Sequence, residues 1–440
     1  PQNPENLSNP KIPETKKDQN EINLNKETLP EDQVAPELVQ RIKNRGRTTP
    51  PTKQTTVISE IKLQAISTRK EFTALETEWD AFLLKTQTPS PFLSWDYIDV
   101  WWDVYGNKGF DVKFYIARDS NGRLIGAAPL MISQKDAFAG ARSKFRHLSF
   151  IGGVGDLLGE SLELPALPGY EVALGEAAAE LIMQEFQGQW DVLYFYLVPH
   201  DSRSTNTMLR HLAMAGVGVR TVASLESPIM PVTGSWESAV QKRSKNTRNR
   251  IRQMYPVPRG KYMHEQCLVG EDISLEAGYE ELVRLAEARW GQDESRAFHT
   301  PEFVDFHWKL APRFLAKKQL HFGLIKIKDE YAGAVYDFTF ANKKWGYQMP
   351  WDLKYSQERV GNMLNIWSLA DTHDQGLREF DFLPGDSGVK DRWATYHRVL
   401  NIYEAACPRS MGGTLFSLAR GIDRLLKQKE KHSAPLSHEE

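Results

Sequence analysis

The side chains with the clearest chemical potential lie in the loop PGDSGVKDRW, residues 384–393. Asp386 is an acid, and Lys390 and Arg392 are cations. A carboxylate in such a loop can orient or deprotonate a nucleophile, and a cation can stabilise a developing oxyanion. The same residues, together with Asp391, can instead form a surface ion-pair cluster that only holds the loop in place. The sequence leaves both interpretations open.

The elements before this loop predict how it is positioned. WGYQMPW (345–351) is typical of a short strand, DLKYSQERV of a polar loop, and Gly361-Asn362 of the start of an amphipathic helix that ends before Gly376. REFDFL (378–383) alternates apolar and charged residues, as a strand buried on one face does. A glycine at a helix N-terminus leaves backbone N–H groups that suit a phosphate.

A second candidate region is the basic run between residues 236 and 261, which carries a single acid, Glu237. Its cations are Lys242, Arg243, Lys245, Arg248, Arg250, Arg252, Arg259 and Lys261. In a chain of formal net charge −2, such a cluster indicates a local anion site. The alternative is a solvated helix face, although the run lacks carboxylates spaced to neutralise it.

These residues together resemble a known family. The segment FDFLPGDSGVKDRW, the spacing of Trp351, Asp352, Tyr355 and Gly361, and the upstream basic run are similar to the CelD/BioF-type acetyltransferases of the GNAT superfamily, which are related to the Fem-type aminoacyl transferases. The resemblance extends from about Phe72 to Cys407. The superfamily's phosphate signature departs here, with Gln357 one position early and Met363 in the last place.

The resemblance implies an α+β fold with two tandem GNAT-like halves, each a mixed, mainly antiparallel sheet flanked by helices. It also implies transfer of an acyl group to an amine. The donor is an acyl-CoA or acyl-phosphopantetheine thioester, or aminoacyl-tRNA in the Fem branch. The two departures are that Pro350 has no N–H to give to an oxyanion, and that the phosphate signature is degenerate.

On these grounds we assign candidate roles by position. The assigned catalytic residues are Asp386, Lys390, Arg392 and Asp156, the last of which follows a glycine-rich turn in the first half, where the family keeps an acid near the cleft. The assigned donor-binding residues are Lys245, Arg248, Gln348, Met349, Gly361 and Asn362. The assigned substrate-binding residues are Asp381, Tyr347 and Trp393. For Asp156, a turn aspartate that bonds its own backbone is the alternative.

Composition narrows the class of protein. The chain has 440 residues and nearly balanced charge, which excludes a generally basic protein that coats DNA. It has no apolar run long enough for a transmembrane helix, and it does not begin with a signal-peptide pattern. Its two cysteines, Cys267 and Cys407, lack metal-site spacing, so we expect a reducing, cytoplasmic location and no metal site.

Four regions follow from the pattern of the chain. Residues 1–55 are polar and predict a disordered tail, 56–234 a first GNAT-like half, 235–410 a second, catalytic half, and 411–440 a basic amphipathic helix and tail. We expect the apolar side of that helix to pack on the body, with contact at a membrane surface as the alternative. The aromatic stripe between residues 91 and 106 predicts a core helix.

The sequence therefore predicts an N-acyltransferase that uses acyl-CoA or an acyl-carrier protein, with a peptide lysine or ornithine side chain or a small amine as the acceptor. Two alternatives stay open: a Fem-type enzyme that uses aminoacyl-tRNA, and a non-catalytic binding module in polysaccharide or peptide assembly.

Overall fold

The computed structural model describes residues 61–136, 144–153, 159–291, 298–385, 388 and 390–433, with side chains as far as Ile422. The predicted disordered tail lies outside these ranges. So do two predicted catalytic residues, Asp156 and Asp386.

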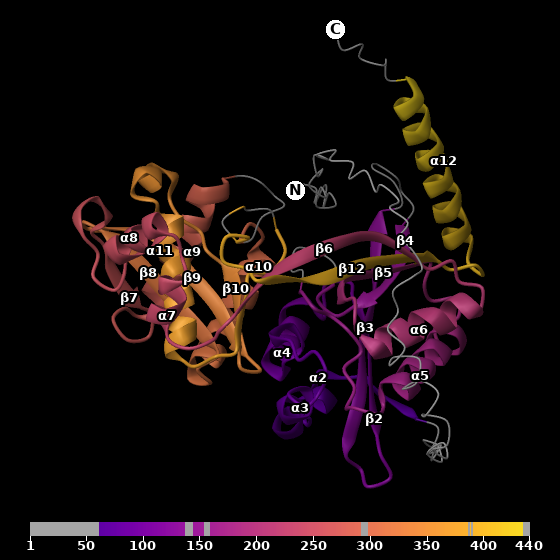
Figure 1. The fold of residues 1–440 in the computed structure, drawn as a ribbon. Coiled ribbons are helices and arrows are strands. Elements are labelled where there is room, and N and C mark those ends of the chain that lie inside the picture. Colours follow the sequence, from indigo (N-terminus) through magenta and orange to yellow (C-terminus); the bar gives the residue numbers. More distant parts are fainter. Residues whose placement is uncertain are drawn as a thin grey trace, which may run out of the picture. The chain divides into compact units, whose positions relative to one another are not determined.

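The described strands form one mixed, twelve-stranded sheet in the order β1-β2-β3-β4-β5-β12-β6-β11-β10-β9-β8-β7 (Figure 1). The strands are β1 Leu63–Ile66, β2 Asp111–Arg118, β3 Leu124–Asp136, β4 Lys144–Phe150, β5 Val192–Pro199, β6 Arg220–Pro231, β7 Glu265–Leu268, β8 Leu320–Ile327, β9 Glu330–Phe340, β10 Lys343–Gln348, β11 Glu379–Asp381 and β12 Tyr396–Ala406.

The pairing pattern occurs twice in this sheet. Strands β1 to β4 are antiparallel and β4 pairs with β5 in parallel, while β7 to β10 are antiparallel and β10 pairs with β11 in parallel. The last strand of each half is exchanged: β12 pairs with β5, and β6 pairs with β11. β6 and β12 run side by side and join the halves. The predicted α+β fold class is confirmed, with the two half-sheets fused into one.

Eleven α-helices are described. They are α2 Arg69–Thr73, α3 Glu76–Leu83, α4 Trp95–Tyr105, α5 Glu171–Gln184, α6 Arg203–Met214, α7 Trp236–Gln241, α8 Lys245–Met254, α9 Leu275–Trp290, α10 Pro301–Ala316, α11 Val360–Asp374 and α12 Met411–Ser433. Short 3₁₀ turns lie at Pro91–Leu93, Gly260–Tyr262 and Leu353–Glu358.

The core extends from one half into the other through α4 and α10. The predicted aromatic stripe of α4 is largely buried, and Tyr97 on that helix contacts Phe306 of α10, with ring centroids 4.9 Å apart. Beside these rings, Asp99 of α4 accepts from Arg69 at 2.8 Å and from Arg313 of α10 at 2.9 Å. Apolar packing and ion pairs therefore both hold the halves together.

Two predicted helices differ from the structure. The helical spacing of apolar residues in FTALETEWDAFLL (72–84) predicts one helix, but the structure breaks it into α2 and α3. The break lets the rings of Phe72 and Trp79 both pack against Phe114, at 5.0 and 5.4 Å. In α12 the apolar stripe does not pack on the body: Leu415, for instance, is 53% exposed. The helix instead contacts the body through Phe416, whose ring meets Phe145.

Candidate functional site

The site is centred where β10 and β11 part. Their parallel pairing runs from Lys343↔Glu379 to Trp345↔Asp381, whereas β10 stays paired with β9 as far as Gln348, across a bulge. At the split, a Cβ on Gly346 would lie 2.8 Å from the ring of Phe380, so this position needs glycine. Beyond Trp345, the edge of β10 that faces β11 has no ladder partner among the residues that the structure describes, and it offers backbone groups to an extended, amide-containing ligand.

The N-terminus of α11 follows β10 after a short turn. The helix begins at Val360, one residue before the predicted Gly361, because Arg359 takes a left-handed conformation (φ 60°) as its N-cap. Arg359 gives no side-chain cap, but its carbonyl accepts from the Asn362 N–H at 2.9 Å. Among the described residues, this leaves the N–H groups of Val360 and Gly361 for a ligand. A Cβ on Gly361 would meet Trp351 Nε1 at 3.1 Å, so this glycine has a packing role as well. Asn362 lies next to it in the same turn.

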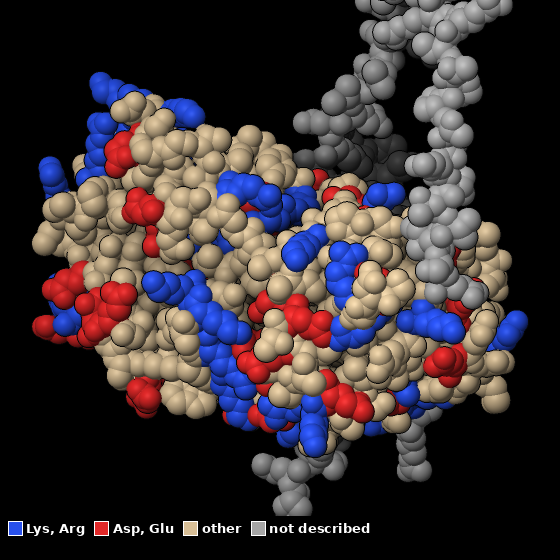
Figure 2. All heavy atoms as spheres, turned by 90° about the horizontal axis from the view of Figure 1, so that it is seen from below, with Lys and Arg blue, Asp and Glu red and all other residues tan. Residues whose placement is uncertain are grey.

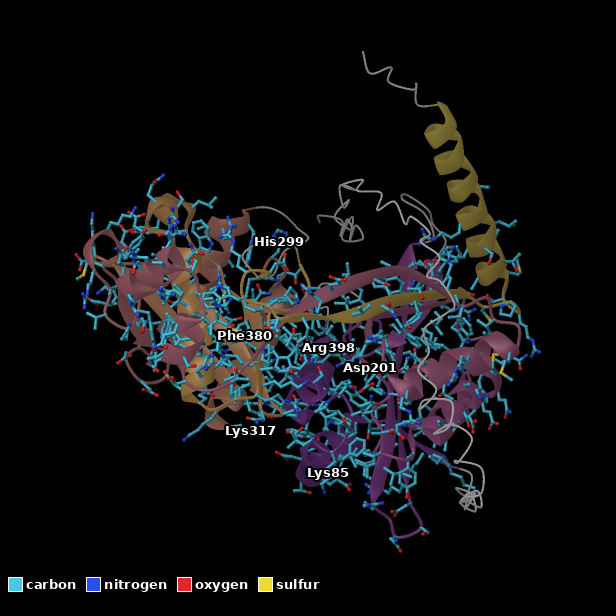
Figure 3. The ribbon with its side chains drawn as sticks, in the orientation of Figure 1. Lys85, Asp201, His299, Lys317, Phe380 and Arg398 are labelled. Carbon is cyan, nitrogen blue, oxygen red and sulfur yellow. The ribbon has the colours of Figure 1, made fainter. Side chains whose placement is uncertain are left out.

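Asp381 lies at the point where the two strands part. It is 1% exposed, so it does not lie on a solvated face of the sheet. Its carboxylate accepts from the Ser227 hydroxyl, the Arg398 guanidinium and the Leu383 N–H. Burial raises the pKa of Asp381, although Arg398 opposes that shift. Figure 3 shows Arg398 centrally, with Phe380 on the side of the second half.

Next to Asp381, Glu379 joins three strands. It accepts from Lys343 of β10 at 3.0 Å, and from Arg398 at 2.8 Å and the Tyr396 hydroxyl at 3.0 Å on β12. Burial by itself raises the pKa of this carboxyl, but Lys343 and Arg398 outweigh it and lower the pKa to about 2. Glu379 therefore stays ionised and holds the strand ends in register.

Lys390 turns inward toward the start of its own loop. Its ammonium donates to the carbonyls of Leu383 at 3.0 Å and Pro384 at 3.4 Å. Burial lowers the pKa of Lys390, while Glu160 and Asp381 raise it in part. Asp391 instead lies 3.2 Å from the ring nitrogen of His397. Lys390 therefore forms no ion pair with Asp391, while Asp386, the other acid of the predicted surface cluster, lies outside the described residues, so that alternative stays open.

Arg392 and Trp393 lie against the basic run. Arg392 is exposed, and its carbonyl accepts from Arg243 at 2.8 Å. Trp393 is buried and stacks on Trp236 at 6.0 Å, with the Arg243 guanidinium 4.6 Å from its ring centre. The predicted substrate contact of Trp393 is untested, and the packing contacts explain its burial.

The predicted donor residues of the basic run lie on α8. Lys245 is exposed, whereas Arg248 donates to the carbonyls of Gln241 and Arg243, at 3.3 and 2.7 Å, and so caps the end of α7. Within the described ranges, no cation of this run lies within ion-pair distance of a carboxylate, and no hydrogen bond or ion pair joins Lys245 or Arg248 to Gly361. The predicted clamp of these three residues remains a prediction.

Tyr347 and its neighbours line the split on the side of β10. The Tyr347 hydroxyl lies 3.2 Å from His307 Nε2, and its ring stacks on Phe338 at 4.6 Å. Burial lowers the pKa of His307 to about 3, so this imidazole is neutral. Gln348 ends β10, and Met349 packs against the apolar cluster beneath α11.

Sequence reasoning missed Glu160, four residues after the predicted Asp156. Its charge interacts with those of Asp381 and Lys390, and its Oε2 atom is buried without a hydrogen bond, although the residue as a whole is partly exposed. Burial and then Asp381 raise its pKa to about 8, and Lys390 opposes them. The available signal was a pair of acids, Glu160 and Glu163, in the mostly apolar run LLGESLELPALP.

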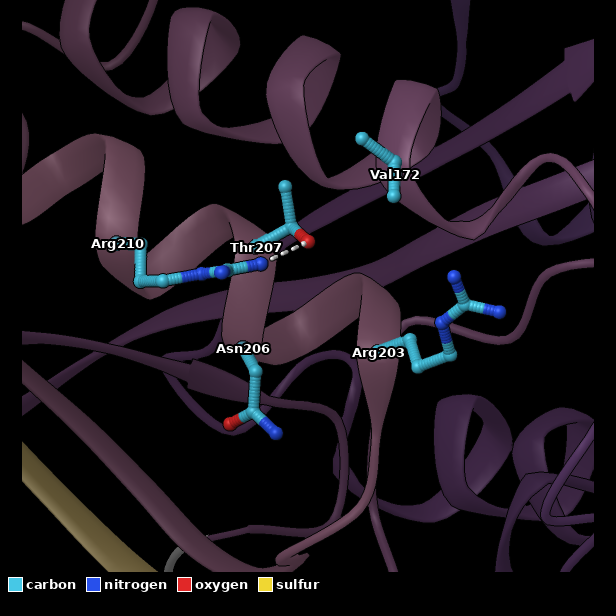
Figure 4. Close-up of a pocket in the computed structure, with 5 residues that line it drawn as sticks. All are labelled: Val172, Arg203, Asn206, Thr207 and Arg210. Carbon is cyan, nitrogen blue, oxygen red and sulfur yellow. Dashed lines mark hydrogen bonds between the residues drawn. The ribbon is translucent and has the colours of Figure 1, made fainter. Parts of the chain in front are cut away.

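Other features of the described residues lie away from this constellation. A hollow of about 380 Å³ is lined by Val172 of α5 and by residues of α6, including Arg203 and Arg210 (Figure 4). On the face drawn in Figure 2, cations and acids are interleaved. No three His, Cys, Asp or Glu side chains gather into a possible metal site in the described ranges, and no described helix has the length and hydropathy to span a bilayer.

Comparisons with known proteins give a family match over part of the chain and a similar fold. Residues 241–393 match the model described as "Acetyltransferase (GNAT) domain", a range that includes β10, α11, β11 and Lys390. The crystal structure of FemX is similar, with 11% identity and a TM-score of 0.53, over 81% of this chain and 99% of that one. No curated protein matches the sequence.

Weaker likenesses extend to two other structures. One is the C-terminal DUF2156 domain of a putative lysylphosphatidylglycerol synthetase from Agrobacterium fabrum, with 10% identity, a TM-score of 0.45, and coverage of 80% of this chain and 96% of that one. The other is a tandem GNAT protein from the clavulanic acid biosynthesis pathway, with 11% identity, a TM-score of 0.43, and coverage of 80% and 100%. The match to the GNAT-type acetyltransferase model is thus confined to residues 241–393, and the narrower CelD/BioF resemblance stays a prediction.

Proposed function

We propose that this protein is an N-acyltransferase that moves an acyl group from acyl-CoA or an acyl-carrier protein to an amine. The observation that carries the proposal is the split between β10 and β11 next to the uncapped start of α11, inside the segment that matches the GNAT domain. A split strand pair can hold the amide-containing arm of the donor, and a helix N-terminus can hold its phosphates.

Donor binding in this proposal uses both ends of the turn between β10 and α11. Gln348 and Met349 lie along the arm, and the N–H groups of Val360 and Gly361, with the side chain of Asn362, contact the phosphates. Lys245 and Arg248 supply positive charge to the phosphate-rich end of the donor. The lack of ion pairs in the basic run, among described residues, supports this assignment because its charge is left for a ligand.

The chemical step needs charge stabilisation at the thioester carbonyl. Pro350 has no N–H to offer, and its own carbonyl accepts from Ala334 at 2.9 Å. The Lys390 ammonium donates to carbonyls at the start of the loop after β11, and it is the proposed oxyanion stabiliser. Arg392, in the same loop, is a second candidate for this role. Asp386 and Asp156 remain candidate acids. Asp381, Tyr347 and Trp393 remain candidates for shaping the acceptor site.

A second candidate donor is aminoacyl-tRNA. Exposed cations on α8, such as Lys245, favour a polyanion as much as they favour CoA. Both donors present phosphate to the same surface and an activated ester or thioester carbonyl to the same split.

Calorimetry with acetyl-CoA, an acetylated carrier protein and aminoacyl-tRNA tests the proposal. We expect the first or second to bind and to raise the melting temperature by mass action. If only the tRNA binds, the donor belongs to the Fem branch. If none binds at millimolar concentration, the proposed function is wrong.

A further inference from the structure

Glu160 belongs to the first half of the chain, and the backbone there holds its carboxyl group near the split between β10 and β11 of the second half. Gly159, just before it, donates to the carbonyl of Gly152 at 2.7 Å, and the carbonyl of Glu160 accepts from Ser90 at 3.1 Å. These bonds fix the backbone on both sides of the side chain. A Cβ on Gly159 would lie 3.4 Å from Phe92.

Phe92 links this position to β10. Its ring centroid is 6.1 Å from that of Trp345, the last β10 residue paired with β11, and 5.7 Å from that of Tyr347, the second residue beyond the split. On another side, the charge of Glu160 interacts with Asp381 and Lys390, at and after the end of β11. Glu160 therefore lies near the point where β10 and β11 part, and the carbonyl of a donor held between these strands would lie at this point.

The groups that face Glu160 leave its Oε2 atom without a partner. The titratable groups that interact with it among described residues are Tyr196 of β5, Asp381 of β11 and Lys390 of the loop. The Lys390 ammonium lies beyond ion-pair distance of Glu160, and it donates instead to the Leu383 and Pro384 carbonyls. A buried carboxyl oxygen without a hydrogen bond is costly, and a ligand that donates to it removes that cost.

We propose, on the basis of the proposed function, that Glu160 binds the acceptor as a primary ammonium and is the general base for its acylation. The ammonium gives one proton to the carboxylate, and the freed nitrogen lone pair forms the C–N bond to the thioester carbonyl. Collapse of the tetrahedral intermediate breaks the C–S bond. The second nitrogen proton goes to the departing thiolate through solvent, and Glu160 returns its proton to water.

The electrostatics around Glu160 fit this role. With a pKa near 8, Glu160 is mostly protonated at pH 7 and ionises when a cation binds next to it. The structure also contains a matched control. Glu163 is a buried carboxyl with a pKa raised to about 7 by burial, but it already bonds the Thr88 hydroxyl and does not interact with Lys390 or Asp381.

Binding of n-butylammonium to the CoA-saturated protein tests the proposal without knowledge of the natural acceptor. Calorimetry in two buffers of different ionisation enthalpy, at pH 7, counts the protons released. We expect net proton release by the wild type and by Glu163→Gln, and none by Glu160→Gln, with weaker binding. Absence of amine binding to the wild type, or equal proton release by Glu160→Gln, overturns the proposal.

Turnover gives a second, independent readout. With acetyl-CoA and n-butylamine, followed by thiol release, Glu160→Gln should slow the reaction at pH 7 by about 100-fold to 10,000-fold. The deficit should shrink as pH rises and free amine accumulates, whereas Glu163→Gln should keep the wild-type pH profile. Equal rates in both variants at every pH contradict the role of Glu160. Failure of acetyl-CoA to bind would instead contradict the proposed function itself.

Discussion

Lys390 combines two properties that a surface lysine does not have. Its ammonium is held by two carbonyls of its own loop, and burial lowers its pKa while the nearby Glu160 and Asp381 favour its charged form. A cation in that position meets a developing oxyanion without first losing a carboxylate partner. The cation is thus preorganised for the charge that develops in the transition state.

Replacing Lys390 by methionine should therefore lower kcat by about 100-fold to 1000-fold, with little change in the KM for acetyl-CoA. Steady-state kinetics with acetyl-CoA and n-butylamine, normalised to folded protein, measure this. Lys108→Met is the control, since Lys108 forms an exposed pair with Glu302 at 3.0 Å that contributes little. A lowered melting temperature with unchanged kcat would mean that Lys390 only holds the loop.

Gly361 allows a second test at this scale, because it has both a packing role and a proposed ligand role. Gly361→Val should raise the KM for acetyl-CoA by about 10-fold to 100-fold, the loss of one or two hydrogen bonds to a charged group. Trp351 must also shift by a few tenths of an ångström, so the melting temperature should fall slightly. Gly421→Val on α12 is the control for placing valine in a helix, because a Cβ at Gly421 would meet no atom outside its own helix turn within 4 Å. An unchanged KM would leave Gly361 with packing alone.

Single residues show where sequence reasoning reached its limit. The loop of Lys390 and the strand of Asp381 were predictable because acids and cations stand out against their neighbours. The partners of Asp381 were not, since Ser227 is 154 positions away and reaches it only because β6 crosses into the second half. Glu160 was missed for the same reason: Asp381 and Lys390, whose charges interact with it, belong to the other half of the chain.

At the scale of elements, local patterns predicted helices better than strand pairing. Helix α11 starts at Val360, one residue before the predicted Gly361, because its N-cap is Arg359 in a left-handed conformation and not a residue with a capping side chain. The strand predicted over 378–383 is shorter, with β11 ending at Asp381, since Leu383 adopts a positive φ of 58° as the chain turns. The parting of β10 from β11 depends on their pairing, which no local pattern reveals.

Glu379 supports a prediction about these elements. Its pKa is lowered in the folded protein, so its contribution to stability is present above the unfolded pKa of about 4.3 and is lost as pH falls toward 2. Lys343 is the other cation paired with Glu379, and burial and Arg398 lower the pKa of Lys343. We therefore assign the stabilisation from ionised Glu379 mainly to Arg398. Because burying the ion pair has its own cost, we set that stabilisation at about 1–3 kcal/mol.

Glu379→Gln should accordingly lower the free energy of unfolding by about 1–3 kcal/mol at pH 7. Relative to the wild type, the deficit should shrink between pH 4 and pH 2. Urea unfolding across that range measures it. Exposed Glu226→Gln, on β6, is the matched control. A deficit that is constant with pH would assign the loss to packing instead of charge.

The whole molecule is organised by the exchange of β6 and β12. Each half repeats the same order of strand directions, which is why a duplication was predictable from the order of helices and strands along the chain. The exchange itself was not, because the sequence of each half is compatible with closing on its own last strand. The result is a continuous sheet in which the acid Glu160 of one half reaches the split strands of the other.

This exchange predicts that the halves do not fold separately. A fragment of residues 56–234 would leave β5 without β12 and would carry β6 without either of its partners. A fragment of residues 235–440 would leave β11 without β6 and would carry β12 unpaired. Both would also expose the α4–α10 packing surface, including Tyr97 and Phe306. Unpaired edges and bared apolar rings favour aggregation.

We expect no cooperative unfolding transition from either fragment by circular dichroism, and recovery of one transition when the two are co-expressed. Two fragments that each melt cooperatively alone would show that the strand exchange adds contacts without being needed for folding.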